Sequence, residues 1–253
     1  QNQRSAQNEL RMHLLVASDP VHPNICAATH MRYDPSGIVT IVMRRLDISI
    51  KDMCAHSMSR LDLRGILFIL SSLVDVFNYL HYTLEIVHRD VTPSNVFLSC
   101  HENKVQLIDF GSAQSKSVLP QSAQLDHGDS QDPYPLHLYV SPDTDKNPFS
   151  TFQDDKGVDD MSGLLSILEL MYSWQVAATM LTLDDACTPI DTFLKSICAD
   201  YKDAYAEIPT SAALYDRTSR FVKEDIARID YPGWTSYMEA CLRTKACKSS
   251  SKH

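Results

Sequence analysis

Two short polar motifs in the first half of the chain restrict its fold more than any other feature of the sequence. The first is His88-Arg89-Asp90-Val91-Thr92-Pro93-Ser94-Asn95, which follows a long apolar stretch and precedes a short one. The second, Asp109-Phe110-Gly111, directly follows another short apolar run. Either tripeptide alone carries little information. The two together, in this order and in a strand–turn context, are highly specific.

The spacing of apolar residues predicts the helices around these motifs. The strongest pattern covers Leu63–Tyr82, where a wide apolar stripe is typical of a buried amphipathic helix. Further helices are predicted at residues 8–17, with Pro20 just beyond, and at residues 158–171. After Thr182 the pattern is helical but less regular.

Short apolar runs between turn residues predict the strands. Residues 26–33 and 38–43 flank the turn sequence Asp-Pro-Ser-Gly, which predicts a hairpin. Residues 96–98 and 105–108 predict two more strands. The polar stretch 112–135 is expected to form a long loop. Early strands and later helices indicate an α+β fold dominated by helix.

The charge balance argues against a nucleic-acid partner. The chain has 23 Lys and Arg against 32 Asp and Glu, so its net charge is −9. Such a chain repels nucleic-acid phosphates unless its basic residues are segregated. The one basic cluster lies in the tail, where a frayed terminal segment is the favoured interpretation; it consists of Arg243, Lys245, Lys248 and Lys252.

The cysteines and the apolar segments bear on the location of the protein. Its seven cysteines form no C-x-x-C pair, and no N-x-[ST] sequon occurs, which favours a cytoplasmic or nuclear setting. The N-terminal residues have no apolar core of a signal peptide. The apolar stretch at residues 66–77 is interrupted by Ser71, Ser72 and Asp75, so no membrane partner is expected.

The pattern H-R-D-x-x-x-x-N followed by D-F-G resembles the catalytic loop and metal-binding loop of eukaryotic protein kinases. Three further segments resemble that family: residues 79–81 the end of the large lobe's central helix, residues 139–143 the A-P-E element, and residues 159–169 the helix that anchors the catalytic loop. In that helix the resemblance assigns Asp159, Ser162 and Glu169.

The resemblance implies a division of the chain. Residues 1–46 would be a remnant of the kinase small lobe, with part of its β-sheet. Residues 47–248 would form the mainly helical large lobe, and residues 249–253 a disordered tail.

The resemblance also implies a role for each motif residue in phosphoryl transfer, which is catalysed mainly by positioning and charge neutralisation. Asp90 would orient the hydroxyl of a protein substrate, and Arg89 would pair with an anionic group of the activation loop. Asn95 and Asp109 would hold Mg²⁺ against the phosphates of ATP. The other nucleotide-facing positions would be Glu9, Met43, Leu46 and Phe97. Glu9 would be the ion-pairing glutamate of the small-lobe helix, although surface helices also carry Glu for solubility.

Two positions depart from the family in the same network. Thr92 stands where Ser/Thr kinases have a lysine that reaches the transferred phosphate, and Leu136 where they have a threonine bonded to it. Losing that cation should weaken transition-state stabilisation. Tyrosine kinases also lack the lysine, but their loop sequences A-A-R-N and R-A-A-N do not match residues 92–95. The Ser/Thr branch is therefore favoured.

A third departure concerns the phosphate-covering loop. The sequence has no G-x-G-x-x-G, and its first lysine is Lys51. We therefore expect a kinase domain without the front of its small lobe, which binds Mg-ATP poorly by itself. The intact parent would phosphorylate protein Ser/Thr. Two alternatives stay open: a pseudokinase or scaffold that binds partners without transferring phosphate, and a fragmentary gene product without activity.

Overall fold

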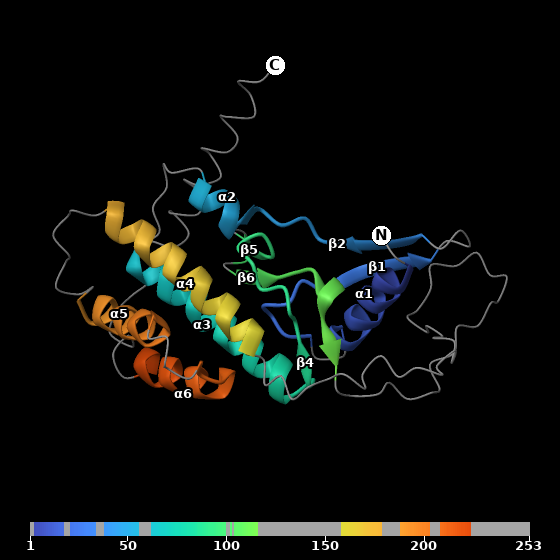
Figure 1. Cartoon of the computed structure of the whole chain (residues 1–253). Helices are drawn as coiled ribbons and strands as arrows, with labels where there is room; N and C mark the ends of the chain where they lie inside the picture. The colour runs from blue at the N-terminus through green and yellow to red at the C-terminus, as the bar shows by residue number, and fades with distance from the viewer. Residues whose placement is uncertain are drawn as a thin grey trace, which may run out of the picture.

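The computed structural model of this chain describes residues 3–17, 21–33, 38–55, 62–99, 102, 104–115, 158–178, 188–202 and 208–223. Its first part consists of one helix and one hairpin. The helix α1 spans Gln3–Val16, and β1 (Ala28–Tyr33) pairs antiparallel with β2 (Val39–Met43). Figure 1 shows α1 and this hairpin at one end of the molecule, with the longer helices gathered at the other.

The helix α3 (Leu63–Tyr82) lies at the centre of the helical part. It begins where Asp62 Oδ1 accepts a hydrogen bond from the Gly65 amide at 2.7 Å, which satisfies a donor of the first turn. The apolar stripe is buried as its spacing predicts, with Ile66 and Phe77 fully inaccessible. Among the described residues α3 is long and apolar enough to cross a membrane by length and composition, yet most of it is buried in the fold.

Three helices pack against α3: α4 (Val158–Ala178), α5 (Thr188–Lys202) and α6 (Ser211–Phe221). Side chains also join these helices to one another. The Tyr172 hydroxyl donates to Asp191 Oδ1 at 2.8 Å, which ties α4 to α5. The rings of Phe193 and Phe221 stack with their centroids 4.0 Å apart, which ties α5 to α6.

A small antiparallel sheet connects the hairpin to the helical part. Its strand order is β3 (Ile48–Ser49), β5 (Val96–Ser99) and β6 (Lys104–Leu107), and the short helix α2 (Ile50–Ala55) follows β3. Ser49 lies opposite Phe97, and Phe97 lies opposite Gln106. A parallel bridge from Ile25 to Leu107 attaches the segment before β1 to this sheet.

The elements confirm the predicted α+β fold. The helix Leu63–Tyr82, the hairpin and the strand pair β5–β6 all form, and the helix predicted at residues 158–171 continues to Ala178. The helix predicted at residues 8–17 begins earlier, at Gln3. The expected loop 112–135 starts instead with ordered structure, because β7 (Gln114–Ser115) pairs with β4 (Ile86–Val87).

Some predictions fall on residues outside the described ranges. These are the A-P-E resemblance at residues 139–143, the position of Leu136, the basic tail and most of the stretch 112–135. The division of the chain at residues 46, 248 and 249 stays a prediction.

Candidate active site

One buried carboxylate holds the backbone of the loop that carries Asp90. Asp160, near the start of α4, accepts hydrogen bonds from the His88 amide at 2.7 Å and the Arg89 amide at 2.6 Å. Arg89 has a φ of 65°, a left-handed conformation that is uncommon for a residue with a side chain. These bonds to one carboxylate stabilise the strained turn and fix the direction in which the loop leaves β4.

This arrangement corrects the sequence prediction, which assigned the anchoring role to Asp159. In the structure Asp159 is exposed, whereas Asp160 is fully buried. The two residues are adjacent, and successive helix positions differ by about 100° in direction. Only Asp160 therefore faces the loop. Ser162 and Glu169, assigned with Asp159, are half-buried on α4.

A network that the sequence analysis missed extends from Asp160 to α6. His81 Nε2 lies 2.9 Å from Asp160 Oδ2, and His81 Nδ1 lies 2.8 Å from Ser211 Oγ. Ser211 and Asp160 are fully buried, so this serine–histidine–aspartate chain has no access for a substrate. It instead connects α6, α3 and α4 to the loop that carries Asp90. No sequence signal could have found it, because Ser211 and His81 are 130 residues apart.

The close approach of α4 to the loop depends on a glycine. A Cβ atom added to Gly163 would lie 2.5 Å from the carbonyl oxygen of Val91, far inside van der Waals contact. A side chain at this position would therefore push the loop away from the helix.

The imidazole of His88 joins the two motifs. Its Nδ1 accepts from the Asp90 amide at 3.3 Å, so Nε2 carries the proton and donates to the Ile108 carbonyl at 3.0 Å. Burial lowers the pKa of His88, against the opposing effect of the Asp160 charge, and favours this neutral form. His88 is therefore a packed, hydrogen-bonded residue that links the two motifs.

Asp90 and Asn95 form one hydrogen-bonded unit. The Asn95 amide nitrogen donates to the Asp90 carbonyl oxygen and to Asp90 Oδ2, each at 2.9 Å. Since both donors point at Asp90, the amide oxygen Oδ1 of Asn95 is left as an acceptor. The Asn95 carbonyl accepts from the Ile108 amide at 3.0 Å, which places Asn95 beside the residue that precedes Asp109.

Asp109 begins a short turn in which the aromatic ring of the next residue, Phe110, is buried. Its φ is 65°, its side chain is exposed, and Oδ1 accepts from the Gly111 amide at 3.2 Å. Phe110 is fully buried, with its ring centroid 4.9 Å from that of His88 and 5.7 Å from that of His13 in edge-to-face contacts. The burial of Phe110 directs the neighbouring carboxylate outward.

The helix α1 is tied to the same turn. The Asn8 side-chain amide donates to the carbonyl oxygens of Gly111 at 3.2 Å and Ala113 at 2.9 Å. The next residue, Glu9, is half-buried; its pKa is raised by burial and then by the negative charge of Asp109. Among the described residues no cation pairs with Glu9, and its ion-pairing role stays a prediction.

These residues fit a divalent cation chemically. The carboxylate of Asp109 and the free amide oxygen of Asn95 are hard oxygen donors of the kind that Mg²⁺ prefers. The negative charges of Glu9 and Asp109 also repel each other, and a bound cation would relieve this repulsion. The described residues contain no cluster of three or more His, Cys, Asp or Glu able to hold a metal by themselves.

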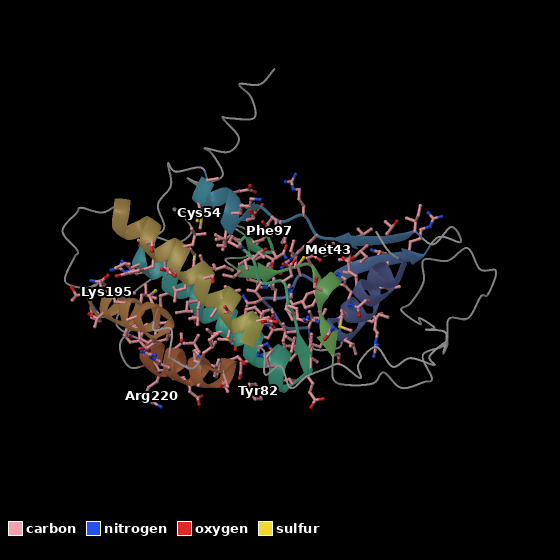
Figure 2. The ribbon with its side chains drawn as sticks, in the orientation of Figure 1. Met43, Cys54, Tyr82, Phe97, Lys195 and Arg220 are labelled. Carbon is pink, nitrogen blue, oxygen red and sulfur yellow. The ribbon has the colours of Figure 1, made fainter. Side chains whose placement is uncertain are left out.

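The remaining positions predicted to face a nucleotide lie near the junction of the hairpin and the small sheet (Figure 2). Met43 ends β2, Leu46 lies in the link to β3, and Ser49 of β3 pairs with Phe97 of β5. All three assigned side chains are half-buried. Figure 2 shows Met43 and Phe97 where the hairpin meets the small sheet. Next to Met43, Arg44 forms an ion pair with Glu102 that connects this link to the turn between β5 and β6. Whether these positions contact a nucleotide stays a prediction.

Thr92 and Arg89 complete the loop. Thr92 is half-buried and its carbonyl accepts from the Asn95 amide at 3.0 Å, so it forms part of the turn rather than supplying a cation. The Arg89 side chain is exposed, and its predicted anionic partner belongs to residues outside the described ranges.

The comparison with protein families agrees with this geometry. A family model described as the protein kinase domain matches residues 1–130. This range covers just over half of the 253-residue chain and includes both polar motifs.

Proposed function

This chain belongs to the protein kinase domain family, and we propose that it supplies the catalytic loop of a kinase that phosphorylates Ser or Thr of a protein substrate. The observation that supports this proposal is the Asp90–Asn95 unit beside Asp109. The Asn95 side chain orients that of Asp90, and its amide oxygen remains available as an acceptor.

Each residue has a separate task in this proposal. Asp90, held by the Asn95 amide, orients the substrate hydroxyl and accepts its proton. Asn95 and Asp109 hold Mg²⁺, and Mg-ATP supplies the phosphoryl group. Asp160 fixes the loop in the geometry that these tasks require. Met43, Leu46 and Phe97 are proposed to contact the base of the nucleotide.

The Ser/Thr assignment depends on residues 92–95. Their sequence, Thr-Pro-Ser-Asn, lacks the arginine and alanine pattern of tyrosine kinases. Because Thr92 replaces a lysine, we expect catalysis to be slow: one cation near the developing charge is missing.

One observation favours a second function, a scaffold that binds partners without phosphoryl transfer: Thr92 supplies no charge where Ser/Thr kinases have a lysine. A kinase-like domain without this cation can keep its fold and its partner-binding surfaces while it transfers no phosphate.

The two functions are separated by a transfer assay on the full-length natural gene product. The protein is incubated with radiolabelled ATP, Mg²⁺ and mixed Ser, Thr and Tyr peptides, and the labelled amino acid is identified. We expect label on Ser and Thr that is lost in Asp90→Asn, retained in the exposed loop control Ser94→Ala and increased in Thr92→Lys.

Each other result has a distinct meaning. Transfer no higher than in Asp90→Asn, even with Thr92→Lys, would reject the enzyme and leave the scaffold. Label on tyrosine would reject the Ser/Thr assignment alone.

A further inference from the structure

The first turn of α6 carries a serine whose side chain is buried inside the protein. Thr210 caps this helix: its Oγ1 accepts from the Ala213 amide at 3.2 Å and so fixes where the helix begins. Ser211 follows and is fully buried, and Leu214, one turn later, is buried as well. A buried hydroxyl needs a hydrogen-bond partner, so the role of Ser211 depends on the group that it contacts.

That partner is the ring of His81 near the end of α3. Ser211 Oγ lies 2.8 Å from Nδ1, and the His81 side chain is only 6% exposed. The other ring nitrogen, Nε2, faces a carboxylate oxygen of Asp160, which can only accept, so Nε2 carries the ring proton. In the neutral ring Nδ1 is then an acceptor, and Ser211 donates its hydroxyl proton to it. The serine and the carboxylate therefore fix the orientation of the ring from opposite sides.

The carboxylate of Asp160 depends on this ring. Its Oδ2 accepts from His81 as well as from the His88 amide, while Oδ1 accepts from the Arg89 amide. A buried charge is stabilised by the number and the geometry of its hydrogen bonds. If the ring turned away, Asp160 would lose one of its donors, and the loop would be held by a less constrained carboxylate.

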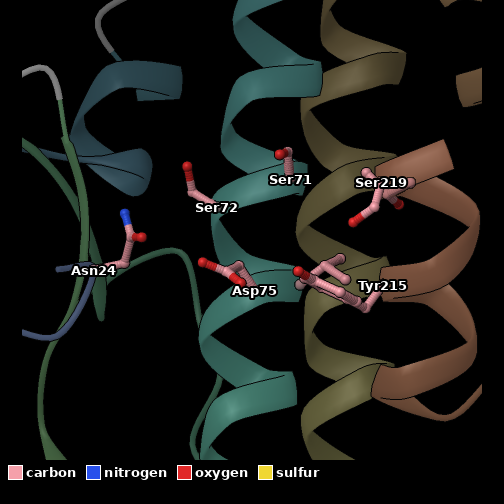
Figure 3. A pocket seen from close by; sticks show the side chains of 8 residues that line it. Asn24, Ser71, Ser72, Asp75, Tyr215 and Ser219 are labelled. Atoms are coloured by element: carbon pink, nitrogen blue, oxygen red, sulfur yellow. The ribbon is translucent and has the colours of Figure 1, made fainter. Parts of the chain in front are cut away.

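Farther along α6 the contact with α3 is interrupted. Tyr215, Thr218 and Ser219 line a polar cavity of about 260 Å³ together with residues of α3. Figure 3 shows α6 beside α3 at this cavity, with Tyr215 directed toward Asp75. Because the two helices pack less closely here, the placement of Ser211 depends on the first turn of α6.

We propose that Ser211 is a positioning residue for the loop that carries Asp90. Its hydroxyl holds the ring of His81 in the orientation that donates to Asp160, and Asp160 holds the loop. The docking of α6 is thereby coupled to the geometry of the loop. The consequence for catalysis rests on the proposed function, whereas the coupling itself does not require phosphoryl transfer.

The coupling is tested with Ser211→Ala in the isotope-labelled 253-residue chain. The melting temperature should fall by about 2–4 °C, since Nδ1 of a buried ring is left unpaired. The Arg89 amide should exchange its hydrogen about two- to tenfold faster, and the NMR signal of the His81 Nε2 proton should shift or broaden. A merely structural effect would accelerate exchange equally in the strand pair β5–β6, so the acceleration at Arg89 has to exceed the one measured there.

Thr218→Val is the matched control. It also removes a buried hydroxyl from α6, since Thr218 is 2% exposed, but this Oγ1 forms no hydrogen bond among the described residues. Valine keeps the shape of the side chain. We therefore expect no loss of stability and an unchanged exchange rate at Arg89.

A double-mutant cycle shows whether Ser211 acts through His81. In His81→Leu the ring is absent, so the addition of Ser211→Ala should not accelerate exchange at Arg89 any further. Additive effects of the two substitutions would mean that the serine reaches the loop by another route, and would overturn the proposal. It is also overturned if Ser211→Ala leaves the exchange rate at Arg89 unchanged, or if Thr218→Val accelerates it as much.

The consequence for catalysis is measured by phosphoryl transfer with the full-length natural gene product. Ser211→Ala should lower kcat about three- to tenfold, because Asp90 is positioned less accurately, and should leave KM for ATP unchanged. An active enzyme with an unchanged kcat would overturn the positioning role. If the unmodified protein transfers no phosphate, the proposed function fails, and the exchange rates at Arg89 alone decide the coupling.

Discussion

The carboxylate of Asp160 accepts the backbone amide of Arg89 at 2.6 Å, although the two residues are 71 positions apart in the sequence. The contact holds a residue with a positive φ at the turn into the loop that carries Asp90. The geometry of Asp90 is therefore set by a helix that belongs to the other half of the chain.

Replacing this carboxylate should destabilise the fold. Asp160→Ala would leave three donors without their acceptor inside the fold: the buried amide of His88, the amide of Arg89 and the ring of His81. We expect a loss of about 2–5 kcal/mol in the free energy of unfolding. Urea denaturation would measure this loss, and hydrogen exchange of the Arg89 amide should become faster.

The neighbouring residue supplies the control. Asp159→Ala removes the same group one position earlier, where the side chain is exposed, and should cost clearly less, at most about 1 kcal/mol from its charge at the helix N-terminus. If the two variants were equally stable, the anchoring role of Asp160 would be wrong.

A second prediction concerns the glycine of α4 beneath the loop. In an open helical position, Gly163→Ala would be stabilising by about 1 kcal/mol, because alanine is the better helix former. Here the added methyl would meet the Val91 carbonyl at 2.5 Å, so we expect destabilisation by about 1–3 kcal/mol. Thermal denaturation gives the sign directly, which makes this a sharp test.

The same experiment has a control on the same helix. Leu170 is 44% exposed on α4, and Leu170→Ala should change the melting temperature little. A more stable Gly163→Ala protein would show that α4 and the catalytic loop are further apart than described.

The sequence predicted the elements well where apolar periodicity is strong. The boundaries of α3 agree with the prediction at both ends, because a wide apolar stripe and the capping Asp62 act together. The hairpin was predicted from its turn chemistry. In both cases the local signals and the tertiary packing favour the same conformation.

Asp159 was assigned wrongly because the prediction did not use the positions of the apolar residues along this helix. Asp160, Leu164 and Ile167 recur at helical spacing and are all buried, whereas Asp159 shares its face with the exposed Ser166 and Leu170. The spacing of the apolar residues therefore places Asp160, and not Asp159, on the buried face of the helix. Matching the family's spacing by residue type alone placed the carboxylate on the wrong face.

Local sequence patterns do not encode contacts such as the bond from His81 to Ser211, which depends on how α6 docks against α3. The bonds from Asn8 to the Asp109 turn also join segments more than 100 residues apart.

The last prediction concerns acid stability and His13. This side chain is fully buried, and neither ring nitrogen has a hydrogen-bond partner. Burial lowers its pKa, and the charge of Asp109 opposes the shift only in part. Below the unfolded pKa of about 6.5, the unfolded chain binds a proton that the folded chain resists, so stability falls as the pH decreases.

The variant His13→Leu removes both the unpaired nitrogens and this titration. We expect the variant to gain about 1–3 kcal/mol at neutral pH, with a shallower loss between pH 7.5 and 5.5, measured by urea denaturation at each pH. Part of the pH dependence should persist, because the pKa values of His22 and His88 are lowered too. A His13→Leu curve parallel to that of the unmodified chain would contradict the prediction.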